Sequence, residues 1–457
     1  MIGIGISNSV GAYRSFVDPA ASAFFAATGL TGATERNAVN TLVTSLKSAG
    51  LWSKMKAVYP FVTDNRNLLS YTEDFGNAVW LQENVVITAN SALSPNNTLT
   101  ADTISEGSTL NFHNIRQIPA ALSGSNIVFS VYINKNTARY VRLILSGGSS
   151  TVWTAAQFDL DTLTFTGGAG TSATGSFVSA SITQASNGFY RCEIVSSLGG
   201  ANITNSWISL SDGSAIVNTN NFGRVSYQGT NKSVYLWGAQ VEPGSTATTY
   251  QPIATTQQSY ISNQFKYNLV NPVDSDAAFR LVFNGGWTMS NQGATPNGTN
   301  GYADTKLVPS SVLSSQNSQH YSMYSRTNVA ESRYGFGSDD VRLGLKWGDG
   351  ILYAKLGIAE LGYGTNSTSL GLHLMSRTDS TNLPVFVRNT KINMASVSSS
   401  LSGLAILLGA RQLSASVDSY GSRQLAFSSI GDGLTDTEAT ALYNAVQTFN
   451  TSLSRQV

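Results

Sequence analysis

The feature that most constrains this sequence is an interruption in its pattern. A helix-rich opening runs into a strand-like stretch at residues 51–62, and the same texture resumes only near residues 264–269. Between them, residues 67–252 show no helical periodicity, only alternating apolar runs such as 126–133 and 140–145, separated by Gly- and Ser-rich turns. Because the ends of a domain usually lie close together, one domain can be inserted into a loop of another. The pattern therefore predicts a host domain that carries an inserted domain.

The interruption gives explicit domain boundaries. We predict a discontinuous host domain of residues 17–63 and 264–457, an inserted domain of residues 64–256, and a linker of residues 257–263. Residues 1–16 are apolar and contain glycine, so they are either an anchor segment to another protein or a first strand of the host domain. A chain of 457 residues also exceeds what one hydrophobic core usually serves.

A helical hairpin is predicted at the start of the host domain. Asp18 has the character of an N-cap, Pro19 suits the first helical position, and Gly29 follows the expected end of a short helix. A second helix is predicted over residues 34–49, with Gly50 as its stop. Its apolar positions recur at helical spacing on one face.

A closing helix is predicted over residues 436–453. Thr435 and Glu438 form the pattern of a capping box, and apolar side chains follow at helical spacing at Leu442, Val446 and Phe449. The remaining host residues have strand-like texture. The predicted fold class is therefore mainly β: two β-sandwich domains of jelly-roll type, with the N-terminal hairpin and the C-terminal helix packed on the host domain.

Composition excludes several classes of partner. The net charge is +1 and no basic run is present, so a nucleic-acid partner has no electrostatic footprint. No stretch reaches the 18 or more apolar residues that a membrane helix needs, which predicts no membrane insertion. Charged residues make up 12% of the chain, about half the usual share, so the surface should be polar but uncharged. The single cysteine, Cys192, excludes an internal disulfide and is predicted to be a buried, inert thiol.

Tryptophan is the residue type that most suggests a ligand. Sugars offer apolar ring faces together with hydroxyl groups, so sandwich modules bind them with exposed aromatic rings and a few polar groups. Four residues are candidates for glycan binding, although each also suits core packing: Trp153, Trp207, Trp287 and Trp347. Trp80 and Trp237 lie near the ends of the inserted domain and are predicted to be structural.

The sequence selects no catalytic, cofactor or metal site. Asp159 with Asp161, and the pair Asp339–Asp340, are the tight acidic clusters, and such pairs commonly form turns. The three histidines are far apart in sequence, which leaves a site assembled across the fold open. No nucleophile elbow is present and no pair of carboxylates is singled out. We therefore predict that the chain is not an enzyme, with a polysaccharide depolymerase as the alternative.

The host residues resemble a known class of protein. The runs DAAFRLVFNGGWT at 276–288, PNGTNGYADT at 296–305, YSRTN at 324–328 and IGDGL at 430–434 resemble virion proteins of tailed bacteriophages that contain a laminin-G or concanavalin-A-like sandwich. In that class the strand near residues 54–62 is followed by the Tyr267 region after a short loop. This chain departs from the class by its long insertion.

The inserted residues resemble a second module of the same viruses. The segments NLL at 67–69 with Trp80, NGFYR at 187–191, YLWGAQVE at 235–242 and ATTY at 247–250 resemble carbohydrate-binding-like jelly rolls of phage tail fibres, tail spikes and head appendages. The two resemblances cover most of the chain beyond its first residues.

Together the resemblances imply a bacteriophage virion structural protein, made in the bacterial cytoplasm and exposed on a tail fibre, collar or capsid. They imply other virion proteins as partners, a homo-oligomer with a trimer by analogy with phage fibres, and attachment to glycans of the bacterial surface. The inserted jelly roll would carry the recognition. A capsid or collar decoration protein that binds no glycan is the alternative within this class.

Overall fold

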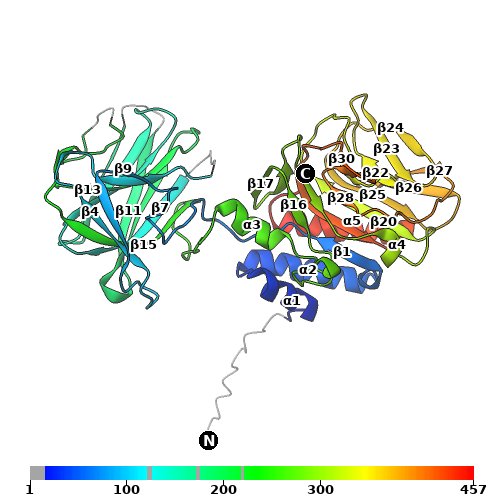
Figure 1. Cartoon of the computed structure of the whole chain (residues 1–457), viewed down its shortest axis with the longest axis horizontal. Helices are drawn as coiled ribbons and strands as arrows, with labels where there is room; N and C mark the ends of the chain where they lie inside the picture. Colours follow the sequence, from blue (N-terminus) through cyan, green and yellow to red (C-terminus); the bar gives the residue numbers. More distant parts are fainter. Residues whose placement is uncertain (1–15, 121–125, 171–174, 218–220) are drawn as a thin grey trace, which may run out of the picture. The chain divides into compact units, whose positions relative to one another are not determined.

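The computed structural model describes residues 16–120, 126–170, 175–217 and 221–457. Its contacts divide the chain into two compact units (Figure 1): a discontinuous unit of Met1–Asp64 with Ile261–Val457, and an inserted unit of Asn65–Tyr260. The predicted anchor segment, 1–16, lies outside the described residues apart from Phe16, which is exposed. Residues 257–263, which we expected to be a linker, are helical and lie within α3 (Gln257–Phe265).

The fold class is confirmed as mainly β, with helices near both ends of the discontinuous unit. The first helix, α1 (Pro19–Thr28), begins where the Asp18 carboxylate accepts a hydrogen bond from the backbone N–H of Ala20 at 2.9 Å. The second is α2 (Ala33–Ser48). The last, α5 (Asp436–Ser452), begins with the predicted capping box of Thr435 and Glu438. No helix in the described ranges is both long and apolar enough to cross a bilayer.

The discontinuous unit contains two large antiparallel sheets (Figure 1). The eight-stranded sheet has the order β17 (Trp287–Ser290), β18 (Gly293–Pro296), β31 (Leu425–Gly431), β20 (Gln319–Ser325), β25 (Gly371–Arg377), β26 (Asn382–Val387) and β27 (Thr390–Ala395), and β1 (Met55–Tyr59) also pairs with β31. The seven-stranded sheet has the order β16 (Val282–Asn284), β19 (Tyr302–Asp304), β28 (Leu407–Leu408), β21 (Phe336–Gly337), β22 (Val341–Gly344), β23 (Ile351–Leu356) and β24 (Glu360–Thr365).

Short elements complete this unit: the ribbon of β29 (Arg411–Gln412) and β30 (Val417–Asp418), the helix α4 (Pro309–Val312), and the single turns η1 (Trp52–Lys54) and η3 (Asp276–Ala278). The α1, α2 and α5 helices share one apolar core with strands of the larger sheet. Because β1 pairs with β31 in that sheet, strands from both segments of the discontinuous unit build one structure.

The inserted unit is a pair of six-stranded antiparallel sheets. The first has the order β10 (Thr164–Ala169), β9 (Trp153–Asp159), β8 (Tyr140–Ser146), β13 (Asn205–Ser211), β6 (Asn114–Gln117) and β2 (Leu81–Glu83). The second has the order β11 (Ser176–Gln184), β12 (Tyr190–Ser197), β7 (Asn126–Lys135), β15 (Ser233–Pro243), β4 (Ala101–Glu106) and β3 (Val85–Ala92). A small ribbon, β5 (Leu110–Asn111) with β14 (Tyr227–Gln228), and the turn η2 (Ser186–Gly188) complete it.

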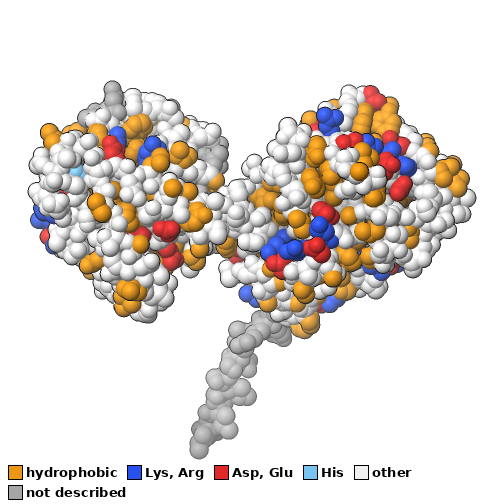
Figure 2. Space-filling model, in the orientation of Figure 1, with side chains coloured by type: hydrophobic (Ala, Val, Ile, Leu, Met, Phe, Trp, Pro, Cys, Tyr) orange, Lys and Arg blue, Asp and Glu red, His pale blue; other side chains and the backbone are white. Residues whose placement is uncertain are grey.

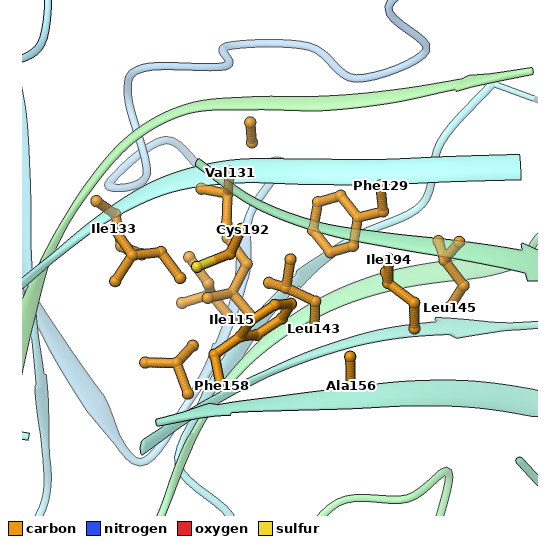
Figure 3. Packing of buried hydrophobic residues seen from close by; sticks show 14 of the residues in the cluster. Ile115, Phe129, Val131, Ile133, Leu143, Leu145, Ala156, Phe158, Cys192 and Ile194 are labelled. Atoms are coloured by element: carbon orange, nitrogen blue, oxygen red, sulfur yellow. The ribbon is translucent and has the colours of Figure 1, made fainter. Parts of the chain in front are cut away.

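The core of the inserted unit is built by side chains from both sheets (Figure 3). Ile115, Leu143 and Phe158 come from the first sheet, and Val131 comes from the second. Cys192 lies in this core with no exposed surface, which confirms the predicted burial, and this burial raises the pKa of its thiol. Since successive side chains of a strand point to opposite faces, the neighbours of these core residues lie on the outer face of each sheet.

The surface agrees with the low charge of the chain. In the view of Figure 2, backbone and uncharged side chains make up most of the face, and Lys, Arg, Asp and Glu side chains occur in small groups. On such a surface, small local groups of charged side chains select a charged ligand, because the protein as a whole produces little electrostatic field.

Candidate functional site

Two rows of side chains cross the outer face of the first sheet of the inserted unit. In one row, Leu81 of β2 and Trp207 of β13 stand directly opposite Arg116 of β6 on its two sides. In the next row, two residues along each strand, Glu83 stands opposite Asn114. Residues two apart on a strand share a face, so both rows belong to one surface. Cross-strand register thus brings two charged groups, an amide and an indole together.

The middle of this face is covered by residues 214–217 and 221–224, which follow β13 and which we call the covering segment. Arg142 of β8, which is 1% exposed, donates hydrogen bonds to the side chain of Gln157 and to the backbone oxygen of Gly223, both at 2.8 Å. It also donates to the backbone oxygen of Ser214. Desolvation of the buried guanidinium lowers the pKa of Arg142 to about 10. Arg142 therefore fastens the covering segment to the sheet.

Trp153, one of the four predicted tryptophans, lies beneath this cover. It has no exposed surface and packs in an apolar cluster with Ile144 and Trp207. A Cβ atom at Gly223 would lie 2.5 Å from the Trp153 ring, so the covering chain touches the indole. A sugar cannot reach the ring of Trp153 in this structure, and we leave it out of the candidate site.

The end of the face near the edge strand β2 stays open and forms a groove. The cavity there has a volume of about 440 Å³ and is lined by Leu81, Gln82, Glu83, Asn114, Arg116, Trp207 and Arg224. Arg224 comes from the covering segment, and the other lining residues come from β2, β6 and β13. We call these seven residues the Trp207 groove.

Two guanidinium groups occupy the surroundings of the Trp207 ring. The guanidinium carbon of Arg116 lies 4.9 Å from the ring centroid, and that of Arg224 lies 4.5 Å from it. Arg224 also lies 4.0 Å from the ring centroid of Phe112. Trp207 is only 5% exposed. We expected an exposed ring for a sugar to stack on, but here the indole positions two cations by cation–π contact.

The charges of the Trp207 groove are unevenly paired. Glu83 accepts a hydrogen bond at 2.7 Å from Arg224 and another at 3.1 Å from the amide of Asn114. Arg116 donates to the neutral side-chain oxygen of Asn205, and among the described residues it has no carboxylate partner. Burial lowers the pKa of Arg224, Glu83 opposes this shift, and the positive charge of Arg116 adds to it.

Two polar atoms of the groove residues lack partners. Within the described part of the chain, neither Oδ1 of Asn114 nor the indole nitrogen of Trp207 makes a hydrogen bond, although both atoms are buried. An unpaired buried donor or acceptor costs about 1–3 kcal/mol, so native structures rarely keep one without a reason.

The other two predicted tryptophans belong to the discontinuous unit and do not meet. Trp287 is half-buried and donates its indole N–H to the backbone oxygen of Asn284 at 3.0 Å. Trp347 is half-buried between Tyr334 and Tyr353, with ring centroids 5.0 and 5.7 Å away. Both stay predictions as glycan-binding residues.

The acidic pair Asp159 and Asp161 has a structural role. Arg139 pairs with Asp159 at 2.7 Å and Lys135 pairs with Asp161. The hydrogen bond from Arg139 holds the pKa of the Asp159 carboxyl well below its usual range. In the described ranges, no group of three or more His, Cys, Asp and Glu side chains is placed to hold a metal ion.

Sequence reasoning named Trp207 but missed Arg116, Arg224, Glu83 and Asn114. Alternation along residues 114–117 places Asn114 and Arg116 on one face of a strand, so the sequence pattern could have indicated that these two residues lie side by side. The approach of Arg224 depends on how the segment after β13 folds back, which local pattern does not specify.

No protein-family model and no curated protein matches this chain. Among solved structures, a Trypanosoma rangeli sialidase in complex with sialic acid matches with a TM-score of 0.29 and 9% identity, covering 75% of this chain and 60% of the sialidase. Domains LG4-5 of the mouse laminin alpha1 chain match with a TM-score of 0.20 and 11% identity, covering 77% and 92%.

A third similar structure is the N-terminal tandem CBM22 domain of Xyn10C from Paenibacillus barcinonensis, with a TM-score of 0.22, 9% identity and coverage of 81% and 98%. These likenesses are weak, and they identify no family.

One expectation needs correction. We predicted that the chain is not an enzyme, and the sialidases among the similar structures contradict that exclusion. At a TM-score of 0.29 the likeness assigns no activity to this chain, so we withdraw the exclusion and put no reaction in its place.

Proposed function

We propose that this chain is a surface-exposed virion protein of a tailed bacteriophage that binds glycans of the bacterial surface through the Trp207 groove. The sequence resemblance supports the virion part of the proposal, including assembly with other virion proteins and a homo-oligomer. The groove supports the binding part. The virion is the proposed location.

One observation carries the binding proposal: the groove combines an apolar rim with accessible hydrogen-bonding side chains. Leu81 is 45% exposed at the rim, and the exposed side chain of Gln82 and the guanidinium of Arg116 line the same cavity. A sugar ring has an apolar face and a ring of hydroxyl groups that both donate and accept. Its chemistry matches this set of residues.

Weak individual sites suffice for a virion protein. Several copies on one particle contact a surface that repeats the same glycan, so binding of the first copy raises the effective concentration for the next. An affinity in the range of about 1 mM for one groove is compatible with firm attachment of the particle.

The test is a glycan array probed with the purified full chain and with a groove variant, Gln82→Ala combined with Leu81→Ser. Both positions belong to the edge strand β2 and line the groove. Lys232→Met, which removes an exposed side chain outside the groove, is the matched control. Binding by the wild type and the control but not by the groove variant supports the proposal.

No binding of any glycan at high display density would contradict it and would favour a decoration protein. Antibody labelling of virions tests the location separately. Label on particles supports the virion assignment, and label confined to lysate proteins outside particles would overturn it.

A further inference from the structure

We infer that the Trp207 groove selects an acidic sugar, one whose single negative charge binds the guanidinium of Arg116. This rests on the proposed function, because it names the class of glycan that the groove would take. The ligand charge is a carboxylate, as in a uronic or similar sugar acid, or a sulfate ester.

The first step is the charge of the groove. Arg116 and Arg224 contribute two positive charges and Glu83 contributes one negative charge, which leaves +1. Glu83 lies 2.7 Å from Arg224, so that pair is internally satisfied. The uncompensated charge is therefore that of Arg116. A ligand group with a single negative charge would neutralise this remaining charge. A phosphate monoester carries a charge of about −1.5 to −2, so it would place excess negative charge next to Glu83.

The second step is the fixed position of Arg116. Its guanidinium packs on the Trp207 ring at 4.9 Å and donates one hydrogen bond to Asn205. Asn205 is held in turn, since its amide donates to the hydroxyl of Ser146 at 3.3 Å. A guanidinium has five N–H donors in a planar fork, and its interactions here leave donors for a ligand. A cation positioned before binding loses little entropy when it pairs with an anion.

The third step is the neutral part of the ligand. Gln82 is exposed in the groove, and its side-chain amide offers a ligand both a donor and an acceptor. A hydroxyl group supplies both functions. Leu81 provides an apolar contact for the ring of the sugar. An anion alone would satisfy Arg116 but not these atoms, so the occupant is an acidic sugar and not a simple ion.

The experiment uses the full chain and an array in which each carboxylated glycan is printed beside its carboxyl-reduced, neutral counterpart. Sulfated and phosphorylated glycans are printed on the same array. We expect reduction of the carboxyl group, or removal of the sulfate, to weaken binding about tenfold or more, since hydrogen bonds between charged groups are about twice as strong as neutral ones. Whether the carboxylated or the sulfated members bind identifies the source of the charge.

Variants of Arg116 show whether this residue is responsible for the preference for an acidic glycan. Arg116→Met should bring the affinity for the acidic glycan down to that for its neutral counterpart, and Arg116→Lys should retain part of the preference because it keeps the charge. Lys232→Met removes the same charge outside the groove and should leave the preference unchanged. Thermal unfolding of each variant shows that it is folded.

The outcomes separate the two proposals. Equal binding of acidic and neutral counterparts, a preference for phosphorylated glycans, or a preference that survives in Arg116→Met would overturn this inference and leave glycan binding intact. Binding of no glycan at all would remove the proposed function and this inference together.

Discussion

Arg116 and Trp207 stand directly opposite each other on β6 and β13, with the guanidinium carbon 4.9 Å from the centre of the indole ring. The relationship reverses the usual role of an aromatic residue in a sugar-binding sandwich. The Trp207 ring holds the Arg116 guanidinium in place, and the guanidinium contacts the proposed ligand. Binding should therefore respond to charge and ionic strength more than to loss of an exposed aromatic face.

The covering segment should be sensitive to volume at Gly223. This glycine has φ +73°, and a Cβ there would lie 2.5 Å from the ring of Trp153. Gly223→Ala should lower the free energy of unfolding of the inserted unit by about 2 kcal/mol or more, because overpacking adds to the strain of positive φ. Gly200→Ala is the control, since Gly200 has φ +85° and open space around its Cβ position.

Urea unfolding of the two glycine variants gives the comparison. Equal losses in the free energy of unfolding for Gly223→Ala and Gly200→Ala would contradict the close contact with Trp153, because backbone strain alone would then explain both losses. Glycan binding should weaken in Gly223→Ala alone, since this segment also carries Arg224.

The discontinuous unit should lose stability as the pH falls from 7 to 5. Burial lowers the pKa of His320 and of His373 from the ordinary 6.5 to about 4. Below pH 6.5 the unfolded chain therefore binds protons that the folded chain still excludes, so stability that is present at pH 7 is lost as the pH falls toward 4. The loss at pH 5 should be about 2 kcal/mol for each histidine.

The neutral state of His320 follows from its partners. Its Nδ1 lies 2.6 Å from the backbone oxygen of Asp432, which can only accept, so this nitrogen carries the proton and Nε2 faces the hydroxyl of Ser429 at 3.1 Å. Urea unfolding of wild type and of a His320→Asn, His373→Asn double variant at pH 7 and 5 measures the effect. Parallel losses in both proteins would contradict the assignment.

Arg455 should be among the most important residues for the stability of the discontinuous unit. Its guanidinium is fully buried and donates to the backbone oxygens of Phe61 and Pro60 at 2.7 Å and of Ala426 at 2.8 Å, and to the side chain of Asn450 at 2.8 Å. Arg455→Met would leave these acceptors without donors. We expect a loss of about 3 kcal/mol or more in the free energy of unfolding.

The matched control for Arg455 is Arg333→Met, at an exposed arginine of the same unit. This change should alter stability by less than about 0.5 kcal/mol. Thermal unfolding measures both variants. A loss for Arg455→Met as small as that of Arg333→Met would show that the four hydrogen bonds contribute little.

The discontinuous unit should fold without the inserted residues. The side chains of Thr63 and Gln264 are hydrogen-bonded to each other, and the Gln264 amide donates to the Asp64 carboxylate at 3.1 Å. The two ends that flank the insertion therefore lie within reach of a short linker. A chain in which Asp64 is joined to Ile261 by a few Gly and Ser residues should be soluble and unfold cooperatively.

Circular dichroism and thermal unfolding test this deletion, with residues 65–260 expressed alone as the companion. An aggregated or unfolded product from the deletion would indicate that the two parts depend on each other, and the predicted division into independent domains would be wrong.

Local signals were enough to predict α1, α2 and α5, but not α3, where we expected a linker, or the short α4. Thr435 and Glu438 are three residues apart and meet within one turn, so the start of α5 was predicted to the residue. Asp18 likewise caps α1 from the adjacent position. Such features depend on neighbours in sequence, and pattern therefore predicts them well.

The candidate site was only partly predictable. Trp153 and Trp207 look alike in sequence, yet one is fully covered and the other borders a groove, because the segment that contains Gly223 folds over the middle of the sheet and leaves the part near β2 open. Arg224 reaches Glu83 across 141 positions of the chain. The strand register and the way the chain folds back over the sheet decide which of these residues meet. Local periodicity in the sequence predicts neither of them.

The most direct test of the account is an NMR titration of the seven tryptophan indole N–H groups in the full chain with the best-binding acidic oligosaccharide from the array. The Trp207 resonance is assigned by its loss in Trp207→Phe. The account predicts that the Trp207 signal shifts on binding while those of Trp153, Trp287 and Trp347 stay in place. A saturable shift of Trp287 or Trp347 with an unchanged Trp207 signal would contradict it.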